Sequence, residues 1–124
     1  MYKLGVIGGM GPLATVNFYE RVVLNTEAKC DNEHIDMIVL NHSTMPDRTK
    51  CIIENRKAEF LEAIKKDFAI LENIGVEAVA IPCNTSHYFY DEFPHEENGG
   101  GRRHYGGWQK QCQGLCAKGN RGHL

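Results

Sequence analysis

The sequence predicts an α/β fold in which helices cover both faces of a parallel sheet, as in Rossmann-like and flavodoxin-like proteins. Three observations support this fold class. Short apolar runs alternate with helical periodicity over the first 93 residues, and each run ends in a Gly-rich or polar segment. The chain has 124 residues, 42% of them apolar and 24% charged, which is the composition of one globular domain.

The first strand is predicted at Lys3–Ile7, and Pro12 then occupies the first position of a helix. This helix is predicted to run to about Lys29. Apolar residues at three- and four-residue spacings predict its buried face, and the charged residues between them predict its polar face. The predicted buried residues are Val16, Tyr19, Val23 and Thr26, and the predicted polar ones are Glu20, Arg21 and Glu27.

The next predicted strand is Ile35–Leu40, and a longer helical pattern follows the polar loop Asn41–Arg48. That helix is predicted to stop at Gly75, before a third strand at Val76–Ile81. Its predicted buried residues are Phe60, Ile64, Phe68 and Leu71. The order of strands and helices predicts parallel pairing with right-handed crossovers.

Three polar or Gly-rich segments follow the carboxyl ends of the predicted strands: Gly8–Pro12, Asn41–Arg48 and Pro82–His87. In parallel sheets these ends share one edge, where ligands usually bind. We therefore expect the three segments to converge on one cleft.

The first of these segments fits the dinucleotide pattern G-x-G-x-x-A over Gly9–Ala14. Dinucleotide binding also needs an acidic residue after the second strand, but that strand ends in Leu40 and Asn41. Pro12 moreover removes a backbone donor from the helix start. Two interpretations remain, a tight turn for close packing of strand and helix, or a cradle for a small anion.

Cys83 is the strongest candidate for chemistry, because it follows a strand at its carboxyl end and precedes a polar run. Thr85 or Ser86 is predicted to begin a helix there, whose positive end would favour the thiolate. The amide of Asn84 and the hydroxyl of Thr85 are candidate substrate contacts. Cys30 and Cys51 are interpreted as structural or incidental.

Two further residues each allow two interpretations. His87 either pairs with Cys83, as in a cysteine hydrolase, or only caps or packs the helix. Arg48 is either a solvated residue in a turn that leads into a helix, or the bidentate partner of a ligand carboxylate.

Three motifs together resemble the aspartate/glutamate racemase family. They are the run from Lys3 to Thr15, the Asn-His-Ser-Thr-Met-Pro-Asp-Arg-Thr run of Asn41–Thr49, and the Ile-Pro-Cys-Asn-Thr-Ser-His run of Ile81–His87. The resemblance implies a cofactor-independent enzyme with two similar α/β domains, each of which supplies one cysteine to the substrate α-carbon.

By this resemblance Cys83 is an acid/base thiol in the racemisation of aspartate or glutamate. A thiolate and a thiol on opposite faces of the α-carbon would exchange roles with the direction of reaction. Arg48 would read the side-chain carboxylate of the substrate. The implied contacts to the substrate backbone are Met10, Gly11, Asn84 and Thr85.

The composition changes near Phe93. Residues 1–93 contain nine Lys and Arg against fourteen Asp and Glu, whereas residues 94–124 contain five against two, with eight of the thirteen glycines. We expect an incomplete racemase-type domain at 1–93 and a Gly/Arg/His-rich tail at 94–124 that is irregular, and disordered or frame-shifted. Because the motif of the partner cysteine is absent, the chain alone is not expected to racemise.

The tail also allows a basic nucleic-acid-binding arm, although a shifted reading frame accounts for more of its composition. A zinc site at Cys112 and Cys116 is disfavoured by their spacing, so no metal is expected, and the family resemblance implies no cofactor. The chain has no apolar run of membrane-spanning length and an odd number of cysteines, five. A cytoplasmic protein is therefore expected. The family resemblance implies an enzyme whose small-molecule substrate is an amino acid, and a homo-oligomer is compatible with the sequence.

Overall fold

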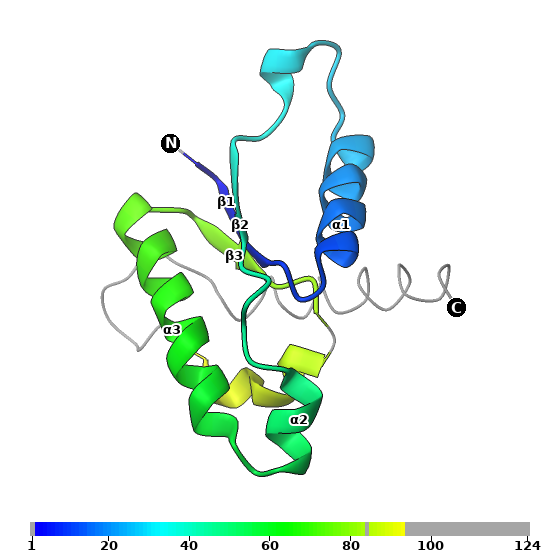
Figure 1. The fold of residues 1–124 in the computed structure, drawn as a ribbon. Helices are drawn as coiled ribbons and strands as arrows, with labels where there is room; N and C mark the ends of the chain where they lie inside the picture. Colours follow the sequence, from blue (N-terminus) through cyan, green and yellow to red (C-terminus); the bar gives the residue numbers. More distant parts are fainter. Residues whose placement is uncertain (1, 84, 94–124) are drawn as a thin grey trace.

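The computed structural model describes residues 2–83 and 85–93 of the chain. Its elements, drawn in Figure 1, are β1 (Leu4–Gly8), α1 (Pro12–Asn25), the short 3-10 helix η1 (Asp31–Glu33), β2 (Met37–Asn41), α2 (Arg48–Ile53), α3 (Lys57–Ile74), β3 (Ala78–Ala80) and the 3-10 helix η2 (Thr85–Glu92). The predicted tail, 94–124, lies outside the described residues, and the domain boundary near residue 93 stays a prediction.

The three strands form a parallel sheet in the order β2-β1-β3. Leu4 of β1 stands opposite Met37 of β2 and Ala78 of β3. Because β1 lies in the centre while the chain passes from β1 to β2 and then back to β3, the sheet is wound in both directions. The α/β fold class is confirmed, with strand ends that differ from the predicted ones by one or two residues.

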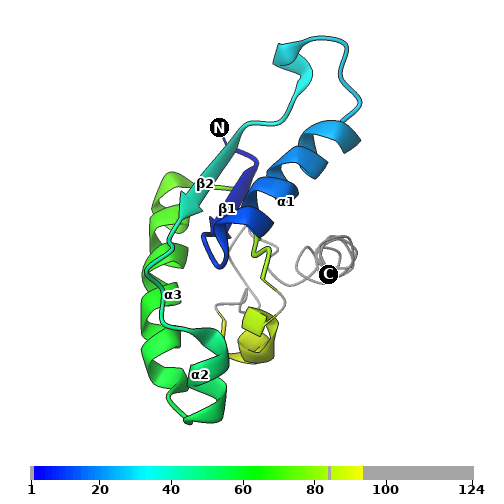
Figure 2. The same cartoon turned by 45° about the vertical axis from the view of Figure 1, so that its right-hand side comes forward.

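Helices α1 and α3 cover opposite faces of this sheet, and Figures 1 and 2 show the same arrangement from two directions. Successive side chains of a strand point to opposite faces, so β1 contributes to two separate cores. Leu4 and Val6 pack with Phe18 of α1, whereas Ile7 packs in the larger core beneath α3.

The buried face of α1 differs from the predicted one. Thr15 and Phe18 are its buried residues, whereas Val16, Tyr19 and Val23 are 59%, 50% and 38% exposed. The prediction failed because α1 carries two adjacent apolar stripes, and helical spacing does not identify which stripe meets the sheet. The helix also ends at Asn25 rather than near Lys29.

The prediction for α3 is confirmed. Its buried apolar residues are Phe60, Ile64, Phe68 and Leu71, and it ends at Gly75 with a left-handed backbone (φ 88°). The preceding segment forms a separate helix, α2, which the sequence pattern did not resolve.

Aromatic contacts fix the segment that follows β3. The rings of Phe60 and Phe89 have centroids 4.8 Å apart, and those of Phe68 and Phe93 are 5.6 Å apart. These contacts hold η2 against α3 through rings that are almost fully buried.

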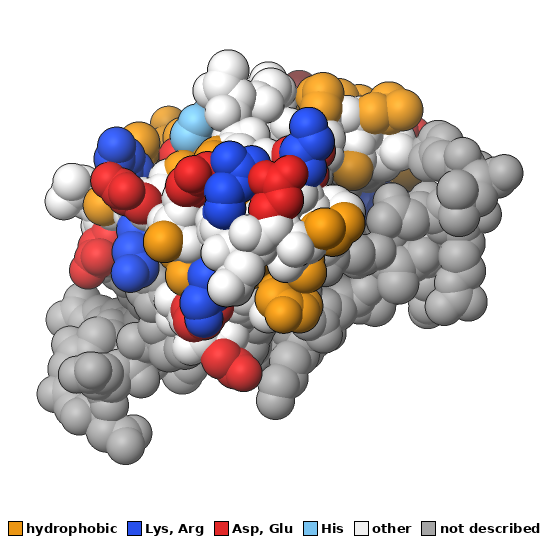
Figure 3. All heavy atoms as spheres, turned by 60° about the horizontal axis from the view of Figure 1, so that its bottom comes forward, with side chains coloured by type: hydrophobic (Ala, Val, Ile, Leu, Met, Phe, Trp, Pro, Cys, Tyr) orange, Lys and Arg blue, Asp and Glu red, His pale blue; other side chains and the backbone are white. Residues whose placement is uncertain are grey.

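On the face shown in Figure 3, charged side chains of both signs are intermixed and hydrophobic side chains appear between and beside them. Within residues 2–83 and 85–93, no helix combines the length and the apolar character needed to cross a bilayer.

Candidate functional site

The turn after β1 is tightly packed between α1 and the turn after β2. A Cβ on Gly8 would lie 2.5 Å from the Thr15 side chain, and one on Gly9 would lie 2.5 Å from the backbone nitrogen of His42. Gly9 also has a positive φ of 91° and donates its N–H to Oγ1 of Thr15 at 2.9 Å. The interpretation as a tight turn for close packing is therefore confirmed.

Met10 and Gly11 differ in exposure within this turn. Met10 is 3% exposed and packs in the core beneath α3, so its predicted contact to the substrate backbone stays a prediction. Gly11 is exposed and precedes α1, and the space where its Cβ would lie is open. The Gly11 carbonyl accepts the Thr15 backbone N–H at 3.3 Å and the Thr15 hydroxyl at 3.2 Å, and the predicted contact of Gly11 with a substrate stays a prediction.

The second segment, Asn41–Arg48, leads from the end of β2 into α2. Asp47 caps that helix, because its carboxylate accepts the Lys50 backbone N–H at 2.9 Å. This hydrogen bond lowers the pKa of the Asp47 carboxyl from its ordinary value of 3.8. The prediction of a turn that leads into a helix is confirmed for this segment.

Arg48 is the first residue of α2 and is partly buried rather than solvated. Its Nη1 donates to the Pro46 carbonyl at 3.3 Å, while its buried Nε has no hydrogen-bond partner among the described residues. A buried guanidinium nitrogen without a partner is energetically costly. A carboxylate brought by a ligand would supply the missing acceptor.

Cys83 follows the carboxyl end of β3, as predicted. Its sulfur is a free thiol, the residue is 8% exposed, and its backbone N–H donates to the Ile81 carbonyl at 2.8 Å. The helix that follows is the eight-residue 3-10 helix η2, not an α-helix. The ring contact of Phe89 with Phe60 holds η2 against α3.

The three segments meet at one edge of the sheet. The His42 N–H donates to the Gly8 carbonyl at 3.0 Å, which joins the second segment to the first. The Ser86 hydroxyl lies 3.8 Å from the Met10 sulfur and joins the third to the first. Met10, Met45 and Cys83 belong to one buried cluster.

Three other predicted residues belong to the segment after β3. Thr85 is exposed at the start of η2, Asn84 lies outside the described residues, and the side chain of His87 is not described. The pairing of Cys83 with His87 therefore stays a prediction.

Sequence reasoning missed one ion pair at the same edge. Nδ1 of His42 lies 2.8 Å from Oδ2 of Asp67, an α3 residue that is only 4% exposed. The available signal was an acidic residue in register with the apolar stripe of α3, three residues after Ile64 and four before Leu71.

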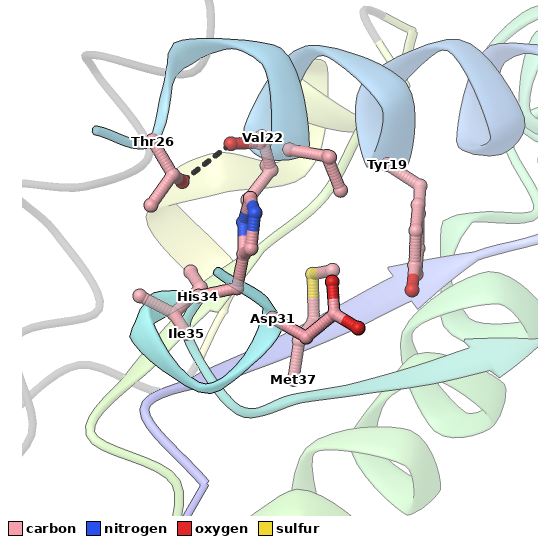
Figure 4. A pocket seen from close by; sticks show the side chains of 8 residues that line it. Tyr19, Val22, Thr26, Asp31, His34, Ile35 and Met37 are labelled. Atoms are coloured by element: carbon pink, nitrogen blue, oxygen red, sulfur yellow. Dashed lines mark hydrogen bonds between the residues drawn. The ribbon is translucent and has the colours of Figure 1, made fainter. Parts of the chain in front are cut away.

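A cavity of about 230 Å³ lies away from this edge (Figure 4). It opens between the second half of α1 and the segment that leads into β2, where the His34 ring points toward α1. Its lining residues are Tyr19, Val22, Val23, Thr26, Asp31, His34, Ile35 and Met37. Because this segment precedes β2, the cavity is at the amino edge of the sheet, opposite Cys83.

The sequence of residues 7–95 matches the family model for Asp/Glu/Hydantoin racemase. The chain belongs to this family. Its three motif segments supply the turn after β1, the turn after β2 and the thiol after β3, all at the carboxyl edge of the sheet.

Known members of the family are similar to this chain over its first three quarters. It is 33% identical over 95 residues to the broad specificity amino-acid racemase RacX of Bacillus subtilis, covering 72% of this chain and 40% of that protein. The structure of Picrophilus torridus aspartate racemase matches with a TM-score of 0.69 and 37% identity, covering 77% of this chain and 42% of that one.

A structure of an aspartate racemase homologue from Pyrococcus horikoshii shares the fold, with a TM-score of 0.57 and 23% identity over 74% of this chain and 40% of that one. The chain thus spans about two fifths of the length of the relatives it matches.

Proposed function

We propose that this chain supplies one half of a cofactor-independent racemase site for an acidic amino acid, with Cys83 as an acid/base thiol. The observation that carries the proposal is the position of Cys83, which follows β3 at the carboxyl edge of the sheet, where the turns after β1 and β2 also meet, in a racemase-family fold. RacX and the Picrophilus torridus enzyme are amino-acid racemases by name, which supports this reaction class.

Inversion at an α-carbon requires a base on one face and a proton donor on the other. The Cys83 thiolate would remove the α-proton, and a second group would return a proton to the opposite face. Cys30 is exposed in the connection that leads to the amino end of β2, and Cys51 is 1% exposed within α2. Cys51 belongs to the same core cluster as Cys83, but we assign the second thiol of a two-cysteine scheme to a segment outside residues 2–83 and 85–93, as the family resemblance implies.

Arg48 supports an acidic substrate. Its buried Nε lacks an acceptor, and a guanidinium binds a carboxylate through two parallel hydrogen bonds. Such a contact would distinguish aspartate or glutamate from a neutral amino acid. Backbone groups of Met10 and Gly11, together with Asn84 and Thr85, would hold the amino and carboxyl groups at the α-carbon.

The carbanion formed at the α-carbon needs electrostatic stabilisation where charge develops. The tight turn at Gly8–Gly9 holds the exposed Gly11 at the start of α1, beside the buried cluster that contains Cys83. A helix start of this kind presents backbone N–H groups to a carboxylate, although Pro12 removes one of them.

The test is α-proton exchange in deuterated water, followed by proton NMR, with both enantiomers of aspartate and glutamate. We expect exchange without net inversion, because the proposal assigns one acid/base thiol, Cys83, to the described residues. Cys83→Ser should slow this exchange by about 100-fold or more. Cys30→Ser is the matched control, since Cys30 is exposed and lies away from the edge.

Exchange that survives Cys83→Ser would contradict the assignment of the thiol. If the unmodified chain shows no exchange, amide NMR with millimolar aspartate decides whether the half-site binds its substrate. The absence of shifts at Gly9–Gly11 and at 42–48 would then contradict the proposed function.

A further inference from the structure

Asp67 is a buried acid on the core-facing side of α3. It is 4% exposed and lies in the same stripe as Ile64, Phe68 and Leu71. Removing a carboxylate from water is energetically costly unless the charge is paired and hydrogen-bonded. A residue of this type at this position therefore depends on a specific partner.

That partner is His42, which lies 25 residues earlier in the chain. Nδ1 of His42 is 2.8 Å from Oδ2 of Asp67, and the histidine side chain is 32% exposed. A carboxylate in its ionised form only accepts hydrogen bonds, and in that form Nδ1 of His42 is the donor. The pair thus fixes the orientation of the imidazole and ties the turn after β2 to α3.

The backbone of His42 is fixed on its other side by the turn after β1. Its N–H donates to Gly8, and Gly9 packs against its backbone so closely that no Cβ would fit there. The Gly9 N–H in turn donates to the Thr15 hydroxyl oxygen of α1. His42 therefore connects α3 with the turn that carries Met10 and Gly11.

We propose that the His42–Asp67 pair is a positioning device for the candidate site, one that holds the turn after β1 and the turn leading to Arg48 in fixed register. The ligand-binding part of this inference rests on the proposed function. The pair acts through the backbone, so neither side chain needs to touch the substrate. Sites that stabilise a transient charge depend on groups fixed before the ligand arrives.

The structural test measures amide hydrogen exchange and chemical shifts in the full chain by NMR. In His42→Ala and Asp67→Ala we expect exchange at the backbone N–H of residue 42 to rise about tenfold or more, with altered shifts at Gly9 and Gly11. Glu62→Ala, which removes an exposed acid from the same helix, is the matched control and should leave both readouts unchanged.

Two conservative variants keep the test decisive if Asp67→Ala fails to fold. Asp67→Asn retains one acceptor oxygen, and His42→Asn places an amide donor near the position of Nδ1. Both should keep exchange at residue 42 within about threefold of the unmodified chain. Unchanged exchange and shifts in His42→Ala would overturn the inference.

The binding test titrates aspartate into the same proteins. We expect affinity to fall about tenfold in His42→Ala and to stay within about threefold in His42→Asn. Equal losses in both variants, with residue 42 still protected in His42→Asn, would show that the imidazole contacts the ligand and would overturn a pure positioning role. If the unmodified chain does not bind aspartate, the proposed function fails, whereas the exchange experiment still decides the role of the pair.

Discussion

Gly9 and His42 approach each other so closely that a Cβ on Gly9 would lie 2.5 Å from the His42 nitrogen and 2.6 Å from its carbonyl carbon. This contact joins the turns after two neighbouring strands. The atoms it involves belong to backbone, which cannot move aside as a flexible side chain can.

Gly9→Ala should therefore destabilise the fold by about 2 kcal/mol or more, because it combines a backbone clash with a positive φ of 91°. Urea denaturation measures the free energy of unfolding. Gly11→Ala is the matched control, with open space at the Cβ position, and should change stability by less than about 1 kcal/mol. Equal effects of the two substitutions would contradict the close contact.

The orientation of α1 predicts that alanine substitutions at two neighbouring positions reduce the stability of the fold unequally. Phe18 is 5% exposed and packs with Leu4 and Val6, so Phe18→Ala should cost about 3 kcal/mol or more. Tyr19 is 50% exposed, and Tyr19→Ala should cost less than about 1 kcal/mol. Thermal or urea unfolding of the two variants measures these losses of stability. A larger loss in Tyr19→Ala than in Phe18→Ala would mean that α1 buries the face that helical spacing predicted.

The unpaired Nε of Arg48 predicts a selective effect on binding. Arg48→Gln removes the positive charge and should weaken binding of aspartate by about tenfold or more, while binding of alanine changes little. Arg48→Lys keeps the charge but loses the planar fork, so it should recover only part of the affinity. NMR or calorimetric titration measures both, and an equal loss for both amino acids would argue against a role in reading the side-chain carboxylate.

The cap of α2 predicts a pH dependence at its first turn. The Lys50 N–H lowers the pKa of the Asp47 carboxyl below 3.8, so the ionised form is favoured by folding. The contribution of this cap to stability is present above pH 3.8 and is lost as the pH falls through the lower folded-state value. The Lys50 amide shift should therefore titrate below pH 3.8, and Asp47→Asn should abolish that titration. A midpoint at or above 3.8 would contradict the hydrogen bond.

The sequence predicted α3 well and α1 poorly, and the reason is visible in the two helices. In α3 one apolar stripe, from Phe60 to Leu71, stands out against charged neighbours, so periodicity identifies the buried face. In α1 the stripe that contains Val16 and Tyr19 lies beside the one that contains Phe18. Only the packing of the sheet selects between them.

The sequence predicted those parts of the candidate site that directly follow the carboxyl ends of the strands. The position of Cys83 and the convergence of the Gly8–Pro12 and Asn41–Arg48 segments follow from parallel topology. The partial burial of Arg48 and the packing of the Met10 side chain could not be predicted, because each depends on neighbours brought together by the fold.

The sequence by itself determined the order of elements, the parallel α/β class and the edge at which the motif residues gather, because these follow from local periodicity and chain connectivity. The tertiary structure alone decided which stripe of α1 is buried and that Asp67 pairs with His42. Both depend on contacts between residues far apart in the chain, and burial makes such contacts energetically decisive.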